Sequence, residues 1–418
     1  MSAFDSIIGY EGVKNELYQV IDIFKNKKKY EDMGAKLPKG LIIFGEPGMG
    51  KTMLAEALIK ESNTDAFIIK NTKSQDELIK EINETFEKAG ELDNCIVFLD
   101  DLDKFSEADG EKCDSRVFVA IQANIDSVKD KNVLVICTIN NIRKLPDSLT
   151  RHGRFDRKIH LDIPTDDDAC KIIEFYLKSK KIKDNLNFED VSKMICYTSC
   201  ANLETVLNEA AILAAYQGKS AIDIDDISKA YVKDYYNVPD FDFECSQEEI
   251  DKTALHEAGH AVVAEALKEG SVGFITIQAM DRDRMSGFTH ICYDFKRRPE
   301  NVLVGLGGKV ACEQFYEGRC ASGCISDLNK VIRLLKGGIC GSGTQGVANI
   351  TLSDEVSTST EAVIKAEIER YLFMVRDILL KNKDFLLKLA KELATKKSLL
   401  YSDIKRIKES VTLVPYVA

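Results

Sequence analysis

The chain has 418 residues, of which 44% are apolar and 30% are charged, and its formal net charge is −11. This length exceeds one ordinary domain, and the composition excludes a disordered, collagen-like or coiled-coil chain. The acidic balance argues against binding to nucleic acid or to an anionic membrane surface, because both require clustered positive charge.

The sequence also bears on targeting to membranes and on the redox state of the cysteines. The longest apolar runs are far shorter than the roughly 18 residues that a membrane-spanning helix needs. The first residues lack the basic start and apolar core of a signal peptide. The twelve cysteines are scattered and include no C-x-x-C pair. We therefore expect reduced thiols, no membrane span in this chain and a cytoplasmic location.

Strand-like and helix-like segments alternate over the first 164 residues. This alternation predicts a parallel sheet covered by helices, which is an α/β core over residues 1–164. The expected strands are Gly40–Phe44, Ala66–Lys70, Cys95–Leu99, Val133–Ile139 and Lys158–Ile163, and the expected helices are Thr52–Lys60, Asp76–Ala89 and Val117–Val128.

The rest of the chain has a different pattern. Residues 165–237 predict a small helical lid, with helices at Asp168–Lys178, Leu203–Gln217 and Asp225–Tyr235, followed by a linker that starts at Asn237. Residues 238–418 predict a mainly helical third domain. Its expected elements are a helix at Gln247–Lys268, one or two strands within Gly273–Tyr293, and a long amphipathic region over Thr360–Leu393.

A phosphate-binding loop follows the first predicted strand. Residues 45–52 read G-E-P-G-M-G-K-T and fit G-x-x-x-x-G-K-[ST] between a strand and a helix. Backbone N–H groups of such a loop bind phosphates, its lysine reaches the β- and γ-phosphates, and its threonine ligates Mg²⁺. The expected contacts of ATP and Mg²⁺ are Gly45, Glu46, Pro47, Gly48, Met49, Gly50, Lys51 and Thr52.

Two later segments complete this nucleotide site. An apolar strand ends in Asp100, which is expected to reach Mg²⁺, and in Asp101, which is expected to polarise the attacking water. After the strand at 133–139, a polar residue at Asn140 or Asn141 is placed to hold that water. The arginines of the segment 151–157 are either arginine fingers for a neighbouring subunit or a solvated basic turn.

A second chemical motif lies in the third domain. His256-Glu257-Ala-Gly-His260 fits H-E-x-x-H within a predicted helix, where both imidazoles share one face and can bind one Zn²⁺. Glu257 then lies beside the water bound to the metal and acts as general base. Residue chemistry alone leaves the third ligand open among His290, Glu265, Glu313 and Asp327.

With both motifs in this order, the chain resembles the FtsH-type AAA+ zinc metalloproteases over almost its whole length. The resemblance implies an ATP-dependent zinc endopeptidase that acts on protein substrates, in a homo-oligomeric ring of six with ATP at each subunit boundary. Besides the two motifs, it rests on Phe4–Gly9, Leu37–Gly40, Gly153–Arg157, Leu203–Ala211, Gly307–Lys309 and Tyr316–Gly318.

The resemblance also implies roles for single residues. Arg151 and Arg154 match the arginine fingers, and Asn140 matches the sensor residue, with Asn141 as the alternative register. Ser322–Leu328 stands where the family has T-G-A-x-N-D-L, which favours Asp327 over Glu313 as the third zinc ligand. Ile8 and Gly9 match a segment that lines the adenine pocket, and strands near Gly287–His290 offer an edge for a substrate backbone.

The chain departs from the family pattern in three places. Family members carry N-terminal transmembrane helices, and this chain begins at the ATPase domain, so we expect a soluble relative. Asp101 replaces the family's glutamate, which predicts slow ATP hydrolysis. Asn71–Leu78 replaces an aromatic-x-Gly pore loop, which predicts a weak grip on substrate. Two alternatives therefore stay open: a zinc peptidase whose ATPase domain mainly assembles the ring, and a nucleotide-dependent remodelling scaffold.

Overall fold

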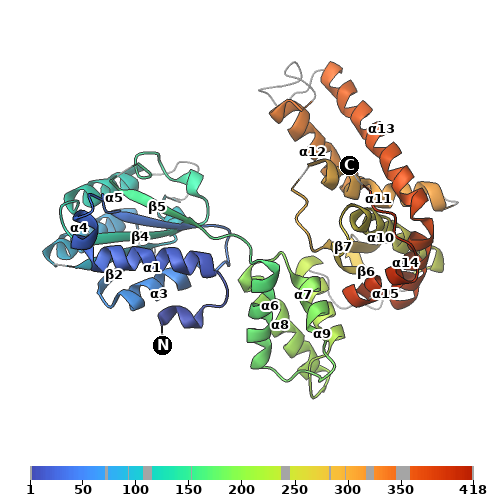
Figure 1. Cartoon of the computed structure of the whole chain (residues 1–418), viewed down its shortest axis with the longest axis horizontal. Coiled ribbons are helices and arrows are strands. Elements are labelled where there is room, and N and C mark those ends of the chain that lie inside the picture. Colours follow the sequence, from blue (N-terminus) through green and yellow to red (C-terminus); the bar gives the residue numbers. More distant parts are fainter. Residues whose placement is uncertain are drawn as a thin grey trace. The chain divides into compact units, whose positions relative to one another are not determined.

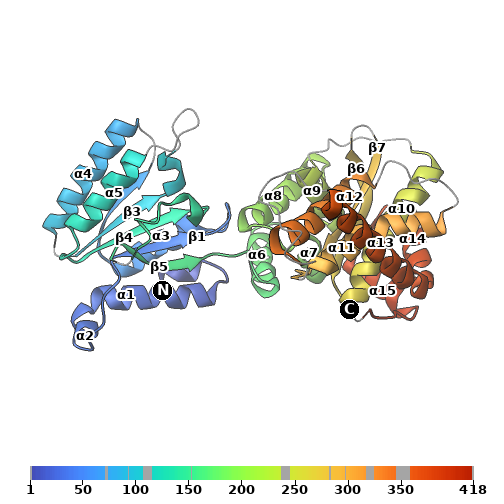
Figure 2. The ribbon, with the colours of Figure 1, turned by 90° about the horizontal axis from the view of Figure 1, so that it is seen from above.

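A computed structural model describes residues 2–70, 74–92, 94–106, 115–151, 153–236, 245–281, 284–296, 298–316, 324–344 and 358–416 (Figures 1 and 2). Contacts divide the chain into two compact units, Met1–Ser179 with Tyr197–Thr205, and Lys180–Cys196 with Val206–Ala418. The segment predicted as a lid contributes to both units. The three-domain division of the sequence therefore stays a prediction.

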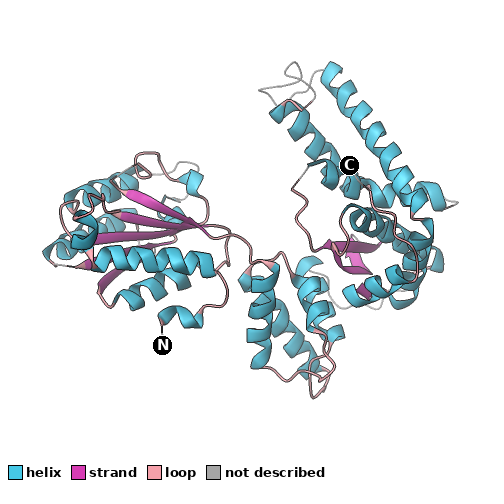
Figure 3. Cartoon of the chain, in the orientation of Figure 1, coloured by secondary structure: helices cyan, strands magenta, loops and turns pink. Residues whose placement is uncertain are grey.

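The first unit contains a five-stranded parallel sheet with the strand order β2-β3-β4-β1-β5. Its strands are drawn in magenta in Figure 3. Alternate residues of its strands face two separate cores: Ile42 packs with helices α4 (Gln75–Glu91) and α5 (Ser115–Ser127), whereas Leu41 and Ile43 pack with α1 (Glu11–Lys25) and α3 (Lys51–Ser62). The predicted α/β sheet is thus confirmed. The strands are β1 (Gly40–Phe44), β2 (Asp65–Lys70), β3 (Cys95–Asp100), β4 (Val133–Ile139) and β5 (Phe155–His160).

The helices predicted at Thr52–Lys60, Asp76–Ala89, Val117–Val128 and Asp168–Lys178 lie close to helices of this unit, whereas the two helices before β1 were not predicted. The helices of the unit are α1 (Glu11–Lys25), α2 (Lys27–Glu31), α3 (Lys51–Ser62), α4 (Gln75–Glu91), α5 (Ser115–Ser127) and α6 (Asp166–Lys178). Helix α8 (Cys200–Tyr216) belongs to the first unit up to Thr205 and to the second from Val206.

One predicted strand was wrong in position. The sequence pattern favoured Lys158–Ile163, because apolar residues recur there, but β5 spans Phe155–His160. It is an edge strand that pairs with β1 alone among the described strands, so Asp156 and Arg157 can remain half-buried within it. The position of β5 at the edge of the sheet, which depends on tertiary pairing, therefore decided where the strand begins and ends.

The second unit is built around helix α10 (Gln247–Leu267), which is buried along most of its length. Beside α10 lies an antiparallel sheet with the order β7-β6-β8. Its strands are β6 (Val272–Asp281), β7 (Arg284–Ile291) and β8 (Ser398–Leu400), and the remaining helices are α7 (Phe188–Ile195), α9 (Ile224–Tyr236), α11 (Arg298–Phe315), α12 (Ile325–Lys336), α13 (Thr358–Lys381), α14 (Lys383–Lys396) and α15 (Tyr401–Glu409).

A glycine contact brings α10 and α11 together. A Cβ on Gly259 of α10 would lie 2.5 Å from the carbonyl oxygen of Gly307, and a Cβ on Gly307 would lie 2.6 Å from that of Gly259. The two backbones therefore touch, which presses α11 against the helix that carries both motif histidines.

Three other features of the described residues bear on the predictions. The amphipathic region Thr360–Leu393 forms two helices, α13 and α14, separated at Asn382, whose side chain bonds Ile378 and Val414. All ten described cysteines are free thiols. Among the described helices, none has both the length and the apolarity to cross a membrane.

Candidate metal centre and nucleotide site

The metal centre is formed by two histidines of α10 and one aspartate of α12. The Nε2 atoms of His256 and His260 lie 3.1 Å apart, and Oδ2 of Asp327 lies 3.2 and 3.4 Å from them. In a tetrahedral zinc site with bonds of about 2.0–2.1 Å, neighbouring ligand atoms are about 3.3 Å apart. The three side chains therefore have the identity and the spacing that one zinc ion requires.

The other candidates for the third ligand lie elsewhere. Their side chains are bound as follows: Glu313 to Lys309, Glu265 to Lys408, and His290 to Tyr231. Among the described residues, His256, His260 and Asp327 form the one group in which three such side chains meet. The structure thus brings together the set that the resemblance implied.

Backbone and sulfur atoms around the imidazoles orient them. Nδ1 of His260 lies 2.7 Å from the carbonyl oxygen of Val304, so its N–H donates there and leaves Nε2 free for a metal. Nδ1 of His256 lies 3.9 Å from Sγ of Cys324. A Cβ on Gly308 would lie 2.5 Å from both rings. Sequence reasoning missed the roles of Val304 and Cys324, since no pattern links them to the motif.

The side chain of Glu257 is buried in the contact between α10 and β7. Its side chain is 5% exposed, and Oε2 accepts a hydrogen bond of 2.9 Å from Thr289 Oγ1. Burial raises the pKa of Glu257. A carboxylate with a raised pKa suits the transfer of a proton from water to a leaving group near neutral pH. Thr289 is a further residue that the sequence did not indicate.

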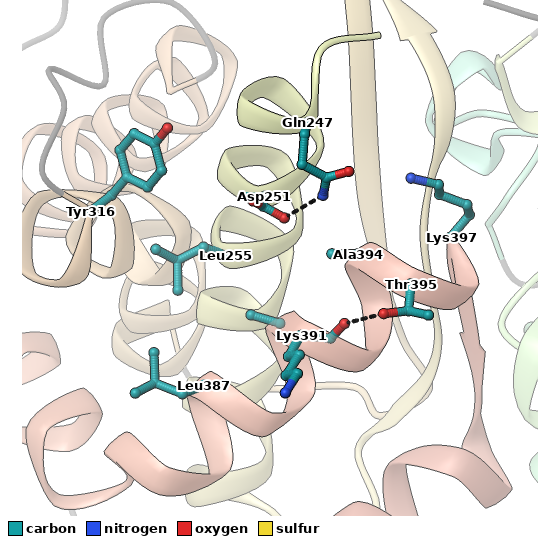
Figure 4. Close-up of a pocket in the computed structure, with 10 residues that line it drawn as sticks. Gln247, Asp251, Leu255, Tyr316, Leu387, Lys391, Ala394, Thr395 and Lys397 are labelled. Carbon is teal, nitrogen blue, oxygen red and sulfur yellow. Dashed lines mark hydrogen bonds between the residues drawn. The ribbon is translucent and has the colours of Figure 1, made fainter. Parts of the chain in front are cut away.

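A groove of about 630 Å³ lies on the other side of α10 (Figure 4). Gln247, Asp251 and Leu255 recur every four residues and face this groove, whereas the helical period turns His256 and His260 away from it. Leu387, Lys391 and Thr395 of α14 form the facing wall (Figure 4). The groove is therefore separate from the metal centre.

The phosphate-binding loop joins β1 to α3, as predicted. Lys51 Nζ donates hydrogen bonds of 2.8 Å to the carbonyl oxygens of Gly45 and Glu46 and to Oδ1 of Asn140. Burial lowers the pKa of Lys51. Within the loop, Glu46, Pro47 and Gly48 are exposed, Gly50 is half-buried, and Met49 packs into the core.

The ends of β3 and β4 supply the acidic and polar groups. Oδ1 of Asp100 accepts hydrogen bonds from Thr52 Oγ1 (2.9 Å) and Thr138 Oγ1 (2.8 Å). Asp101 adopts a left-handed backbone conformation (φ 55°) and pairs with Lys104 at 2.6 Å. The structure therefore brings Lys51, Thr52 and Asp100 to one edge of the sheet, where parallel strands end.

The two asparagines after β4 differ. Asn140 bonds Lys51 and, through Nδ2, Asp103 Oδ2 at 2.9 Å, whereas Asn141 accepts a hydrogen bond from the Arg143 backbone. Asn140 is therefore the one that lies beside the phosphate-binding loop. The contributions of Thr138 and Asp103 were missed by sequence reasoning.

The segment at Ile8 and Gly9 lies near the start of α8. Ile8 is half-buried, and Gly9 (φ 74°) leaves room for Asp168, whose Cγ a Cβ would approach within 2.7 Å. The next residue, Tyr10, reaches Cys200 at 3.5 Å, and the neighbouring Ala201 N–H donates to the carbonyl of Gly48. This segment and the phosphate-binding loop thus border the same turn of α8.

The predicted arginine fingers have different surroundings. Arg154 donates to both carboxylate oxygens of Asp126 on α5, at 3.0 and 2.8 Å, whereas Arg151 is exposed. Within the predicted pore loop, Asn71, Thr72 and Lys73 lie outside the described residues, and Ser74 caps helix α4.

A P-loop ATPase domain followed by a metallopeptidase domain is the class that this fold and these sites define. Comparisons agree: the profile of the ATPase family associated with various cellular activities (AAA) matches residues 41–163, and that of peptidase family M41 matches residues 244–346. The chain belongs to the FtsH-type AAA+ zinc metalloproteases, and the family implies zinc, ATP and Mg²⁺ as cofactors.

Named relatives support this membership. The ATP-dependent zinc metalloprotease FtsH of Malacoplasma penetrans is 30% identical over 400 residues, which cover 88% of this chain and 48% of the relative. FtsH 2 of Salinibacter ruber is 30% identical over 86% of this chain and 56% of its own length. FtsH 2 of a Thermoanaerobacter species is 26% identical over 97% and 82%, respectively. The chain thus spans about half the length of the first two.

Proposed function

We propose that this chain is an ATP-dependent zinc endopeptidase that hydrolyses peptide bonds in proteins. The observation that carries the proposal is the zinc-like spacing of His256, His260 and Asp327, with Glu257 directly beside them on α10. A closed structural zinc site has no use for a buried general base, so the arrangement argues against a remodelling scaffold.

The chain's own residues divide the work at this centre. Zinc, when bound by the three ligands, supplies a Lewis acid that polarises the peptide carbonyl and makes water a better nucleophile. Glu257 takes the proton from that water and delivers it to the leaving amine. Thr289 holds Oε2 of Glu257, which leaves Oε1 to receive the proton. Val304 keeps the His260 ring in the required orientation.

Strand β7 is our proposed substrate-binding edge. Among the described strands it pairs with β6 alone, so it forms an edge of its sheet to which an extended peptide can add. Thr289 lies on this strand and contacts Glu257, so a peptide added to β7 lies beside the proposed general base. This edge favours protein substrates without requiring a particular sequence.

We propose further that the chain works as a hexameric ring, with Arg151 and Arg154 directed at the neighbour's γ-phosphate. Exposed Arg151 is free to do so, whereas Arg154 has to exchange Asp126 for the phosphate. Native mass measured with ATP tests the ring, and a monomer would contradict the arginine-finger roles. The cytoplasmic location stays a prediction that imaging of the tagged chain tests.

One observation favours a second candidate, a zinc peptidase whose ATPase domain mainly assembles the ring. Asp101 is ion-paired with Lys104, which draws its carboxylate away from the role of polarising water. In that case a slowly hydrolysed ATP analogue supports casein degradation as well as ATP does.

Casein degradation and ATP hydrolysis, measured with and without ATP and zinc, test the proposal. We expect degradation that requires zinc, is stimulated by ATP and disappears in Glu257→Gln. Zinc-independent degradation, or degradation that survives in the Gln variant, would contradict the proposed site.

A further inference from the structure

Strand β7 separates Glu257 from α7 and α9, two helices that lie within residues 165–237, the segment predicted as a lid. Successive residues of a strand point to opposite faces, so Gly287 and Thr289 face α10 while Phe288 and His290 face the other way. The contacts agree with this alternation: Thr289 bonds Glu257 on one side, and His290 bonds Tyr231 of α9 on the other. A single strand thus lies between α9 and the proposed general base.

The face toward α9 is tightly held. Tyr231 is 2% exposed, and its hydroxyl lies 3.0 Å from Nδ1 of His290. Rings of Phe274 and Phe288 pack against Tyr231 with centroids 6.2 and 5.8 Å away. Nε2 of His290 lies 3.6 Å from Sγ of Cys196, the C-cap residue that directly follows α7. Helices α7 and α9 therefore both contact this one imidazole.

The ring of His290 has a defined role in this contact. Burial lowers its pKa to about 4, although a hydrogen bond to the Cys196 backbone opposes this effect, so the ring is neutral at physiological pH. A neutral ring accepts one hydrogen bond and donates one. The Tyr231 hydroxyl donates to Nδ1, and the N–H at Nε2 points to Cys196. Both partners are needed to hold the ring.

The face toward α10 leaves little freedom. A Cβ on Gly287 would lie 2.5 Å from Cγ of Glu257, so strand and glutamate are in direct contact. Thr289 Oγ1 donates to both Oε2 and the backbone carbonyl of Glu257, at 2.9 and 3.0 Å. Because β7 is an edge strand that pairs with β6 alone among the described strands, these side-chain contacts contribute to fixing its position.

We propose that His290 is a positioning residue for the general base. Anchored by Tyr231 and Cys196, it holds β7 in place, and β7 in turn holds the Glu257 carboxylate through Thr289. The inference rests on the proposed function, because it gives Glu257 the role of base. The proposed role of His290 makes peptide cleavage depend on helices α7 and α9. None of the hydrogen bonds described above joins these two helices directly to the zinc ligands or to Glu257.

A double-mutant cycle on the full, zinc-loaded chain tests whether β7 holds Glu257 through Thr289, with a short fluorogenic peptide as substrate. Thr289→Val removes the hydroxyl that holds Glu257 and should lower kcat by about tenfold to a hundredfold. Tyr231→Phe removes one hydroxyl and should lower kcat by about threefold to tenfold, with KM and zinc content unchanged. In the Thr289→Val background, Tyr231→Phe should have almost no further effect.

Two further variants sharpen this cycle. Tyr371→Phe deletes the hydroxyl of another buried tyrosine of the same unit, one that stacks with Arg370 of its own helix, and should leave kcat unchanged. His290→Phe should match Tyr231→Phe, whereas His290→Asn, which retains an acceptor near Nδ1, should recover part of the loss. An unchanged kcat in Tyr231→Phe, or the same fold-loss in both backgrounds, would overturn the inference.

Hydrogen exchange tests whether Tyr231 and His290 hold β7 in place, and this measurement does not require catalytic activity. Tyr231→Phe should speed amide exchange in β7 (Arg284–Ile291), and Tyr371→Phe should not. Unchanged exchange in β7 would overturn the inference even in an active enzyme. If the unsubstituted chain cleaves no peptide, the proposed function fails, and exchange still decides whether Tyr231 holds the strand.

Discussion

The metal centre takes its ligating atoms from two helices, α10 and α12, that both pack against α11, whereas the nucleotide site takes its polar groups from the ends of three parallel strands. His256, His260 and Asp327 already have the spacing of a zinc site, and the Val304 carbonyl holds one ring in place. In contrast, Lys51 bonds two carbonyls of its own loop, which phosphate oxygens must replace. Helix packing therefore gives the metal centre its ligand spacing in advance, whereas Lys51 at the nucleotide site has to exchange its hydrogen-bond partners when a nucleotide binds.

The largest effect is expected at the metal centre. Glu257→Gln removes the general base but leaves all three zinc ligands, so casein degradation should fall by about 10²–10⁴-fold. Zinc content and ATP hydrolysis should remain, as metal analysis and phosphate release would show. Degradation near the unsubstituted rate would mean that Glu257 is not the base.

A faster rate of ATP hydrolysis is expected from a substitution at the nucleotide site. Asp101→Glu extends the carboxylate by one bond, and because a misplacement of about 1 Å can cost roughly a hundredfold in rate, ATP turnover should rise by up to that factor. Lys104→Met, which frees Asp101 without lengthening it, is the matched comparison. Slower turnover in the Glu variant would show that the site has adapted to aspartate.

Zinc removal should expose a pH dependence at the metal centre. Although burial lowers the pKa of His260, its hydrogen bond to Asp327 and that residue's charge raise it to about 9. Zinc therefore has to displace one proton below pH 9, and its affinity should rise about tenfold per pH unit from pH 7 to 8 and level off above 9.

Competition titrations with a chelator measure this slope. Glu313→Gln serves as the control, because Glu313 pairs with Lys309 outside the metal centre, and it should leave the slope unchanged. A flat affinity between pH 7 and 8 would show that the proton is absent.

The smallest expected effect is a difference in thermal stability between variants of Arg154 and Arg151. Arg154→Ala breaks the pair with Asp126, and since such partly exposed pairs contribute about 0.2–1 kcal/mol, its thermal midpoint should fall by about 1–4 °C. Exposed Arg151→Ala should leave the midpoint unchanged. Equal midpoints would mean that the pair with Asp126 contributes nothing to stability.

Local patterns in the sequence were sufficient for much of this molecule. The alternation of strands and helices predicted the parallel sheet, because burial on both faces of a strand requires continuous apolar runs. The spacing of four placed His256 and His260 on one face of α10, because the α-helix repeats every 3.6 residues. The glycines around Lys51 predicted the phosphate-binding loop for an equally local reason, its tight turn.

Long-range contacts decided what these patterns left open. Residue chemistry did not choose Asp327, which lies 71 residues from His256, and the choice required a family resemblance. The true range of β5 and the break at Asn382 depended on an edge position and on a contact with Val414. These features depend on which elements pack together, which no window of neighbouring residues contains.

The sequence by itself predicted the two chemistries proposed for this protein, phosphate binding at residues 45–52 and metal binding at His256 and His260, because both patterns follow from short-range backbone geometry. Only the tertiary structure decided how the proposed general base is held. Thr289 and His290 are adjacent in sequence but face opposite sides of β7, one toward Glu257 and the other toward Tyr231. The physical reason is that side-chain contacts across a strand exist only after its neighbours have packed on both faces.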